Sequence, residues 1–238
     1  YNSLFNQDIS NWNVSGVTNM SSMFENTLAF NRSLNWNVSS VTNMSNMFKN
    51  ASAFNGFISN WNTSNVTNMS GMFQNASSFN QPINYNSNTG SWDVSNVTNM
   101  SAMFKNALVF NQPIANWNVS NVTNMNEMFS GATIFNNDIS NWNTSNVYNM
   151  RGMFISTPFN QPIFNWNVEK VLNMGMMFQS NTAFNQDLSN FVLTNIDTTN
   201  GIKDIFKGAT SFNNGEPTGS TTKSLGNNWM KFANTILS

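Results

Sequence analysis

The chain of 238 residues contains no cysteine and no histidine, and only 8% of its residues are charged. Without cysteine no disulfide framework can form, so stability must come from packing and backbone pairing. Nine Lys and Arg stand against ten Asp and Glu, which leaves no basic surplus to neutralise phosphates, and nucleic-acid binding is not expected. No apolar run approaches the roughly 18 residues of a membrane span, so any export signal or anchor is expected outside this stretch.

The chain is rich in asparagine, which makes up about a fifth of all residues. It also contains a short sequence motif that recurs roughly every 25 residues. Aligning the copies on the dipeptide Phe-Asn places repeat starts at Phe5, Phe30, Phe54, Phe79, Phe110, Phe135, Phe159 and Phe184. We therefore predict a tandem-repeat domain over residues 1–211. After Phe212 the repeat motif is no longer recognisable, and residues 212–238 are predicted to form a loop and a partial terminal coil or cap.

Each copy carries two apolar patterns. The apolar-polar alternation from Trp12 to Val14 predicts a short half-buried strand over residues 11–14 and its equivalents. The spacing of Val17, Met20, Met23 and Phe24 predicts one face of a short helical turn. Prolines in the Phe-Asn-Gln-Pro-Ile segment predict a bend that completes the coil; they are Pro82, Pro113 and Pro162.

One such coil cannot bury its apolar face alone, so stacked copies are expected to form a solenoid of about eight coils. The predicted fold is therefore a leucine-rich-repeat-like α/β solenoid with a parallel sheet along one face. At a strand spacing of about 4.8 Å the rod would be roughly 40 Å long. Extra residues at 84–90 in the fourth copy are expected to leave the stack as a loop.

The repeat FNQDISNWNVSGVTNMSSMF and its copies resemble the BspA-like leucine-rich-repeat surface proteins, in a variant rich in Trp, Met and Asn. The resemblance covers about residues 1–212. It implies a leucine-rich-repeat-like solenoid on exported, cell-surface or virion proteins associated with adhesion, and it supplies no catalytic residues. One departure is that Val17, Val41 and Val66 occupy the slot that usually holds a buried Asn or Cys, so a regular horseshoe curvature is not implied.

Asparagines recur in register after Phe, after Trp and before Met, and stacked copies would place them in ladders. Such ladders can satisfy backbone groups that turns leave unpaired, or they can form an exposed polar contact face. The candidate contact surface alternates outward along the strand slot and comprises Ser15, Ser39, Ser64, Asp93 and Asn167. The candidate glycosylation sites begin Asn-X-Ser/Thr triplets and are Asn13, Asn37, Asn62, Asn118 and Asn143, although composition alone also produces such triplets.

Two further columns have a structural and a functional interpretation. The methionine column that contains Met20 and Met23 could bind a soft metal, but its helical spacing and flanking Phe favour core packing. The tryptophan column that contains Trp12 and Trp36 could stack on sugars, but its inward slot beside Ile and Val favours burial.

No enzyme activity and no cofactor are predicted, because the acidic residues are scattered and form no evident cleft. Asp8, Asp138 and Asp187 share one slot, but the nearest two lie two coils apart. The predicted function is a non-catalytic extracellular or cell- or virion-surface spacer or adhesin with weak multivalent contacts. Its expected partners are surface glycans, host or neighbouring-cell proteins, or further copies stacked end to end into a fibre. The alternative is a specific ligand- or receptor-recognition module that uses the 84–90 insert and the eighth repeat.

Overall fold

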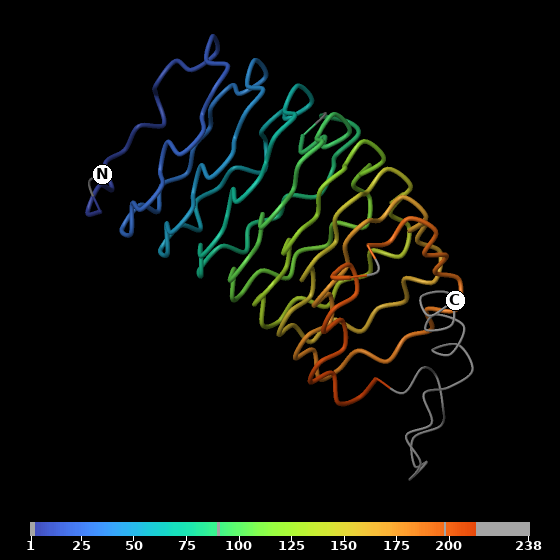
Figure 1. The fold of residues 1–238 in the computed structure, drawn as a ribbon. Coiled ribbons are helices and arrows are strands. Elements are labelled where there is room, and N and C mark those ends of the chain that lie inside the picture. Colours follow the sequence, from blue (N-terminus) through green and yellow to red (C-terminus); the bar gives the residue numbers. More distant parts are fainter. Residues whose placement is uncertain (1–2, 90, 198, 213–238) are drawn as a thin grey trace.

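A computed structural model of the chain describes residues 3–89, 91–197 and 199–212. The repeats form coils that lie side by side in chain order, from the blue coils near the N-terminus to the orange ones (Figure 1). We number the coils by their repeat starts, so that coil one begins at Phe5 and coil eight at Phe184. The Phe rings at consecutive repeat starts stack on one another, from Phe5 and Phe30 at 5.7 Å to Phe159 and Phe184 at 6.4 Å.

The predicted secondary structure is wrong. Over the described residues the chain forms neither a helix nor a sheet, so the prediction of an α/β leucine-rich-repeat solenoid with a parallel sheet does not hold. In place of a sheet, isolated parallel bridges join one asparagine of each coil to its equivalent in the next. The bridged residues are Asn19, Asn43, Asn68, Asn99, Asn124, Asn149 and Asn173.

The expected strand over residues 11–14 is replaced by two tight turns. The amide of Trp12 donates to the carbonyl of Ile9 at 3.1 Å, and the amide of Val17 donates to that of Val14 at 2.9 Å. Because each turn amide bonds a carbonyl of its own coil, this segment cannot pair along its length with the neighbouring coil. The alternation of apolar and polar residues therefore reflects consecutive turns, not a pleated strand.

The expected helical turn over residues 17–24 is also a chain of tight turns, because left-handed backbone occurs within it and again just after it. Ser22 has φ 56° and Asn26 has φ 62°, values that interrupt a right-handed helix. Alternate amides then point sideways: that of Met20 donates to the carbonyl of Asn43 at 2.9 Å, and the pattern continues along the segment. The three- and four-residue spacing is thus shared by a helix and by turns that bond the next coil.

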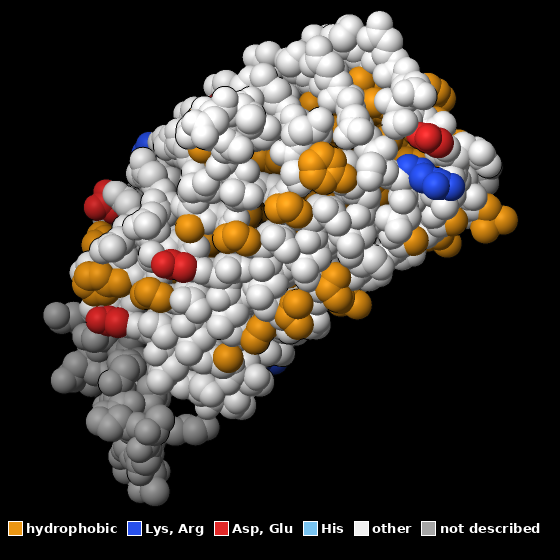
Figure 2. Space-filling view, turned by 180° about the vertical axis from the view of Figure 1, so that it is seen from behind, with side chains coloured by type: hydrophobic (Ala, Val, Ile, Leu, Met, Phe, Trp, Pro, Cys, Tyr) orange, Lys and Arg blue, Asp and Glu red, His pale blue; other side chains and the backbone are white. Residues whose placement is uncertain are grey.

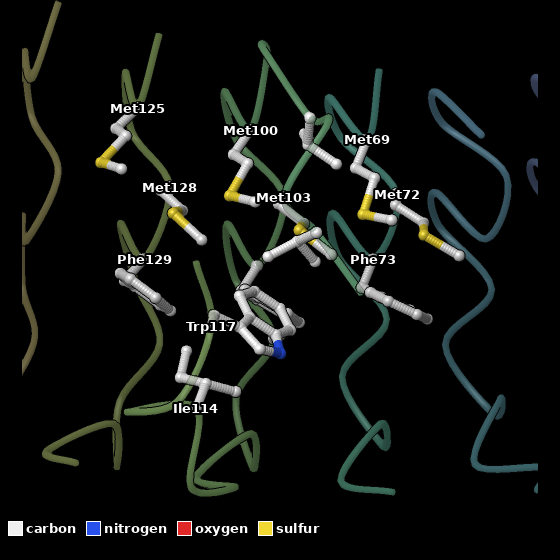
Figure 3. Close-up of a cluster of buried hydrophobic side chains, with 14 of the residues drawn as sticks. Met69, Met72, Phe73, Met100, Met103, Ile114, Trp117, Met125, Met128 and Phe129 are labelled. Carbon is white, nitrogen blue, oxygen red and sulfur yellow. The ribbon is translucent and has the colours of Figure 1, made fainter. Parts of the chain in front are cut away.

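The core is a continuous column of Met, Phe and Trp side chains (Figure 3). The ring of Phe104, near the end of coil four, stacks on that of Phe110, where coil five begins, at 3.9 Å. It also stacks on that of Phe129, further along coil five, at 5.7 Å. Fully burying such a side chain stabilises the fold by about 1.5–3 kcal/mol. Buried methionines fill the remaining space, which favours the core interpretation of that column.

Tryptophans hold neighbouring coils together with both their rings and their indole N–H groups. The Nε1 of Trp36 donates to the carbonyl of Ile9 in the preceding coil at 3.0 Å, and later tryptophans repeat this bond. From Trp36 to Trp166 their side chains are buried, as predicted, and this leaves no open sugar platform. Trp12, in the first coil, is 55% exposed.

The described residues of the 84–90 insert, 84–89, leave the stack as a loop, as predicted. An antiparallel bridge joins Asn86 to Ser91 at its base. Beyond it, the ring of Trp92 returns to the column and stacks on that of Trp61 at 6.4 Å. Most of the predicted terminal segment at 212–238 lies outside the described residues; of that segment Phe212 is described, and its ring stacks on that of Phe184 at 5.9 Å.

Candidate functional site

The candidate contact surface includes the serines Ser15, Ser39 and Ser64 and a column of polar side chains that directly follow the tryptophans, which we call the Asn13 column. Its members are Asn13, Asn37, Asn62, Asp93, Asn118, Asn143 and Asn167. In each coil the side-chain oxygen accepts a hydrogen bond from the amide two residues later, as from Ser15 to Asn13 at 3.2 Å. This local bond is typical of Asn and Asp in turns. It holds the side chain in the same local turn in coils one to seven.

The structure therefore brings the predicted residues together as one repeated array. Asn13 and Asn167 are exposed, whereas Asn62 and Asp93 are half-buried. Among the predicted serines, Ser15 is exposed and Ser39 and Ser64 are half-buried. The five candidate glycosylation sites all belong to this column, and their side-chain oxygens are already engaged by the turn.

The asparagines that follow each repeat-start Phe form a second ladder, which is structural. The side-chain oxygen of Asn6 accepts a hydrogen bond from the backbone amide of Asn31 at 3.0 Å, and every later coil repeats the arrangement. Because these amides lie where the bend prevents backbone pairing, the ladder satisfies donors that would otherwise be unpaired.

A third ladder, which sequence reasoning missed, lies two residues after the inner Phe of coils one to four. The side-chain nitrogen of Asn50 donates to the oxygen of Asn26 at 2.7 Å; Asn75 and Asn106 continue the chain at 2.6 and 2.8 Å. All four residues have positive φ, which Asn tolerates better than other residues with a side chain. Other coils have Gly131 and Gly208 at the equivalent position. Because Asn and Gly both favour left-handed backbone, this substitution pattern could have revealed the ladder from the sequence.

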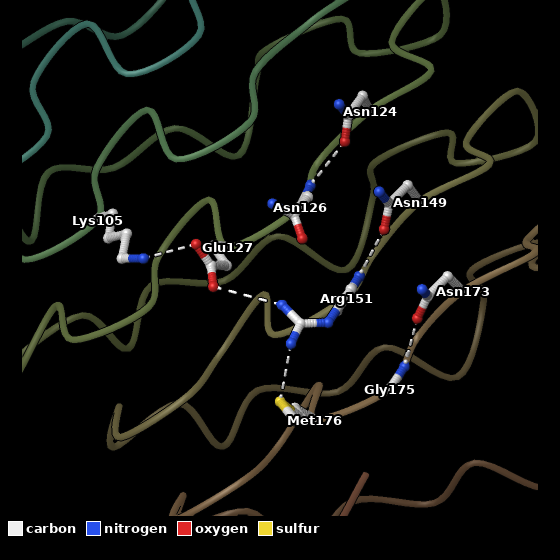
Figure 4. A network of polar contacts seen from close by, with 9 residues as sticks. All are labelled: Lys105, Asn124, Asn126, Glu127, Asn149, Arg151, Asn173, Gly175 and Met176. Atoms are coloured by element: carbon white, nitrogen blue, oxygen red, sulfur yellow. Dashed lines mark hydrogen bonds and ion pairs between the residues drawn. The ribbon is translucent and has the colours of Figure 1, made fainter. Parts of the chain in front are cut away.

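Charged side chains pair across coils near this third ladder (Figure 4). Glu127 lies between Lys105 of the preceding coil, at 2.6 Å, and Arg151 of the following coil, at 3.5 Å. Lys49 and Glu25 form a similar pair at 3.3 Å. Such partly exposed pairs contribute up to about 1 kcal/mol each. The face shown in Figure 2 carries few charged side chains, and rows of hydrophobic side chains lie among its neutral surface.

The aspartates that share one slot are each engaged in a local turn. Bonding to the amide and hydroxyl of Ser10 lowers the pKa of Asp8, and bonding to the hydroxyl and amide of Ser140 lowers the pKa of Asp138. Asp187 accepts a bond from the amide of Ser189 at 2.8 Å. The lowered pKa values of Asp8 and Asp138 favour the ionised carboxylate, the opposite of what a general acid requires.

Among the described residues, no group of three or more acidic side chains lies close enough to hold a metal ion. Nor does any helix in that part of the chain reach the length and apolarity needed to span a bilayer. The surface does contain a hollow of about 250 Å³ between coils seven and eight, lined by residues that include Phe164, Asn167 and Val192. Sequence reasoning missed this hollow, although Phe164 stands where coil five has Ala115.

Comparison with known proteins gives one match. Residues 1–89, 84–191 and 155–235 each match the family described as Mycoplasma protein of unknown function, DUF285. Together these overlapping segments span almost the whole chain, so the repeat character found in the sequence is that of the family. No curated protein matches the chain.

Proposed function

The chain belongs to the DUF285 family of Mycoplasma proteins of unknown function, and from that premise we propose that it is a non-catalytic repeat segment serving as a stiff spacer. The observation that carries this proposal is the unbroken bonding between coils. In one segment of each coil, from residues 20–26 in coil one to residues 174–180 in coil seven, alternate backbone amides donate to carbonyls of the next coil. A stack in which every coil binds only its neighbours resists bending and can be lengthened by adding repeats.

The Asn13 column supports weak multivalent contacts as the second part of this role. It presents small amides at a regular interval, without the varied aromatic or Arg anchors of a high-affinity interface. Many equal weak sites gain strength when both partners are arrayed. Surface glycans, host or neighbouring-cell proteins and further copies of the chain are the partners we propose.

We place the protein outside the cell, or on a cell or virion surface. The support is the resemblance to BspA-like surface proteins and the neutral, amide-rich face of the stack. Asn13, Asn37, Asn118 and Asn143 are exposed on that face, and glycosylation there would mask it. Intact-mass analysis of the natural protein with peptide mapping of these sites distinguishes a masked face from a bare one.

A second candidate is a specific recognition module, and the hollow between coils seven and eight favours it. The 84–90 insert also breaks the uniform surface, and the side chain of Asn116 holds it by donating to the carbonyl of Tyr85 at 2.7 Å. Under this view affinity resides in one place on the monomer.

The two candidates differ in how binding depends on density. We would compare the monomeric chain with the same chain coupled densely to beads, using cells as the target. The spacer-adhesin proposal expects binding by beads alone, unchanged when the insert is deleted. Saturable binding by the monomer, lost with the insert or with the eighth repeat, would instead establish the recognition module. Equal binding of cells to control beads that carry no protein would show that the chain does not cause the binding, and would contradict the spacer-adhesin proposal.

A further inference from the structure

The hollow between coils seven and eight lies where the repeat loses its uniformity. At the slot that holds Ala115 in coil five and Ser140 in coil six, coil seven has Phe164, which is 38% exposed. At the slot of the Asn13 column, coil eight has Val192, which is 49% exposed. Both line the hollow. Two apolar side chains therefore stand together at the end of the Asn13 column, whose members in coils one to seven are all polar.

Polar groups complete the wall of this hollow. Asn165, Asn167, Glu169 and Asn190 line it. The oxygen of Asn167 is held by the amide of Glu169 at 3.0 Å. Among the described residues the side chains of Asn165, Asn190 and Glu169 have no hydrogen-bond partner. Two amides that each donate and accept, together with one carboxylate that accepts, are thus available to a ligand.

The charge of the hollow narrows the class of ligand. Glu169 is its charged lining residue, so anions such as phosphates or acidic sugars are disfavoured. The nearby Lys170 donates to the side-chain oxygen of Asn146 at 2.7 Å and is engaged there. The volume of about 250 Å³ lies below the range of about 300–1,000 Å³ that is usual for drug-sized ligands. A single small ring fits this description.

We infer that the hollow binds one neutral hexopyranose unit. The C–H face of a pyranose would pack on Phe164 and Val192, and its hydroxyls would bond the amides and the Glu169 carboxylate. An aromatic body beside polar groups suits a ligand with one apolar and one hydroxylated side. The site does not depend on the spacer role, since it needs only coils seven and eight in their observed contact.

The test is a titration of the intact chain with the methyl pyranosides of glucose, galactose and mannose, followed by ligand-observed NMR. For a ligand of this size we expect saturable binding to at least one pyranoside, with a dissociation constant on the order of 1 mM. Phe164→Ala should weaken it by about tenfold or more, because it removes the stacking face. Phe57→Ala removes an exposed phenylalanine of coil three that does not line the hollow; it is the matched control and should bind normally.

Glu169→Gln separates a neutral sugar from a cationic ligand. It keeps the shape and an acceptor oxygen, so binding of a neutral pyranoside should fall only a few-fold. Binding of choline that is abolished by Glu169→Gln, with no binding of any pyranoside, would overturn the inference in favour of a cation site. Pyranoside binding that survives Phe164→Ala, or none at all in the unaltered chain, would overturn it outright. A thermal unfolding curve for each variant establishes that it is folded.

Discussion

Coil four, which carries the insert, and the regular coil five reach the same core by different backbone routes. In coil five the amide of Trp117 closes a turn onto the carbonyl of Ile114 at 3.2 Å. In coil four the amide of Trp92 instead bonds the carbonyl of Trp61 at 2.9 Å, and Trp92 has φ 52°. Both tryptophans are nonetheless buried. The stack thus dictates where side chains lie, and the backbone adapts to it.

The largest expected effect comes from substitutions in the cores of coils four and five, which test whether the two cores are equally stable. Phe104→Ala in coil four and Phe129→Ala in coil five each remove a fully buried ring, and both should lower the free energy of unfolding by about 3–5 kcal/mol. Urea denaturation followed by circular dichroism measures this. A much smaller loss for Phe104→Ala would mean that the insert loosens its coil.

The second prediction exploits a carbonyl that the insert leaves with a single bond. Among the described residues, the oxygen of Ile83 accepts only from Nε1 of Trp117, at 2.9 Å. The oxygen of Ile114 accepts from Nε1 of Trp142 and also from the turn amide. Trp117→Phe should therefore cost about 1–3 kcal/mol, since it orphans a buried acceptor, and Trp142→Phe about 1 kcal/mol. Equal costs in urea unfolding would contradict this account.

Deleting residues 85–90 should make coil four regular. The segment that remains, residues 81–84 joined to 91–92, reads Gln-Pro-Ile-Asn-Ser-Trp. It has the same length as the segment Gln-Pro-Ile-Ala-Asn-Trp of coil five. The amide of Trp92 could then close its turn onto Ile83. We expect stability to be kept within about 1 kcal/mol, and the difference between Trp117→Phe and Trp142→Phe to vanish in the deleted chain. A persistent difference in a double-mutant comparison would show that another cause acts.

A smaller effect concerns left-handed residues in the same two coils. Ala102 in coil four has φ 53°, and Gly131 in coil five has φ 72°. Ala102→Gly should raise the free energy of unfolding by about 0.5–1 kcal/mol, because glycine adopts this backbone without strain. Gly131→Ala, whose new Cβ would lie 2.1 Å from the Asn106 side-chain oxygen, should lower it. Thermal unfolding of the pair checks both signs.

The smallest effect is that of pH at the slot occupied by Pro82 and Pro113 in these coils and by Asp138 in coil six. Hydrogen bonds lower the folded-state pKa of Asp138 below its ordinary value of 3.8. Its stabilising contribution is therefore complete above the unfolded pKa and is lost as pH falls through the folded one. Asp138→Asn keeps the turn and should flatten this part of the acid unfolding profile. An unchanged profile would assign acid sensitivity to other carboxylates.

The repeat and its buried positions could be predicted from the sequence, because both depend on the type of side chain. The recurring Phe-Asn dipeptide and the regularly spaced methionines show that type directly. It did not predict the turns, since spacings of three and four residues suit a helix equally well. Left-handed backbone at Ser22, Ala102 and Met176 has no local signal, because none of these residues favours it. The Asn13 column was found from its period, whereas the hollow depends on two coils meeting and was not.

The sideways amides have an electrostatic consequence. In each coil, the peptide groups that donate from Met20, Ser22, Phe24 and Asn26 also direct their carbonyls toward the opposite side. Four rows of peptide dipoles, each of about 3.5 D, thus run head to tail along the stack, much as they do in an α-helix. Amides that bond the preceding coil point the other way and offset part of the sum; examples are that of Thr42, which bonds the carbonyl of Thr18, and that of Asn31, which bonds the side-chain oxygen of Asn6. A nearly uncharged protein is in this way polarised along its axis, positive toward coil eight and negative toward coil one.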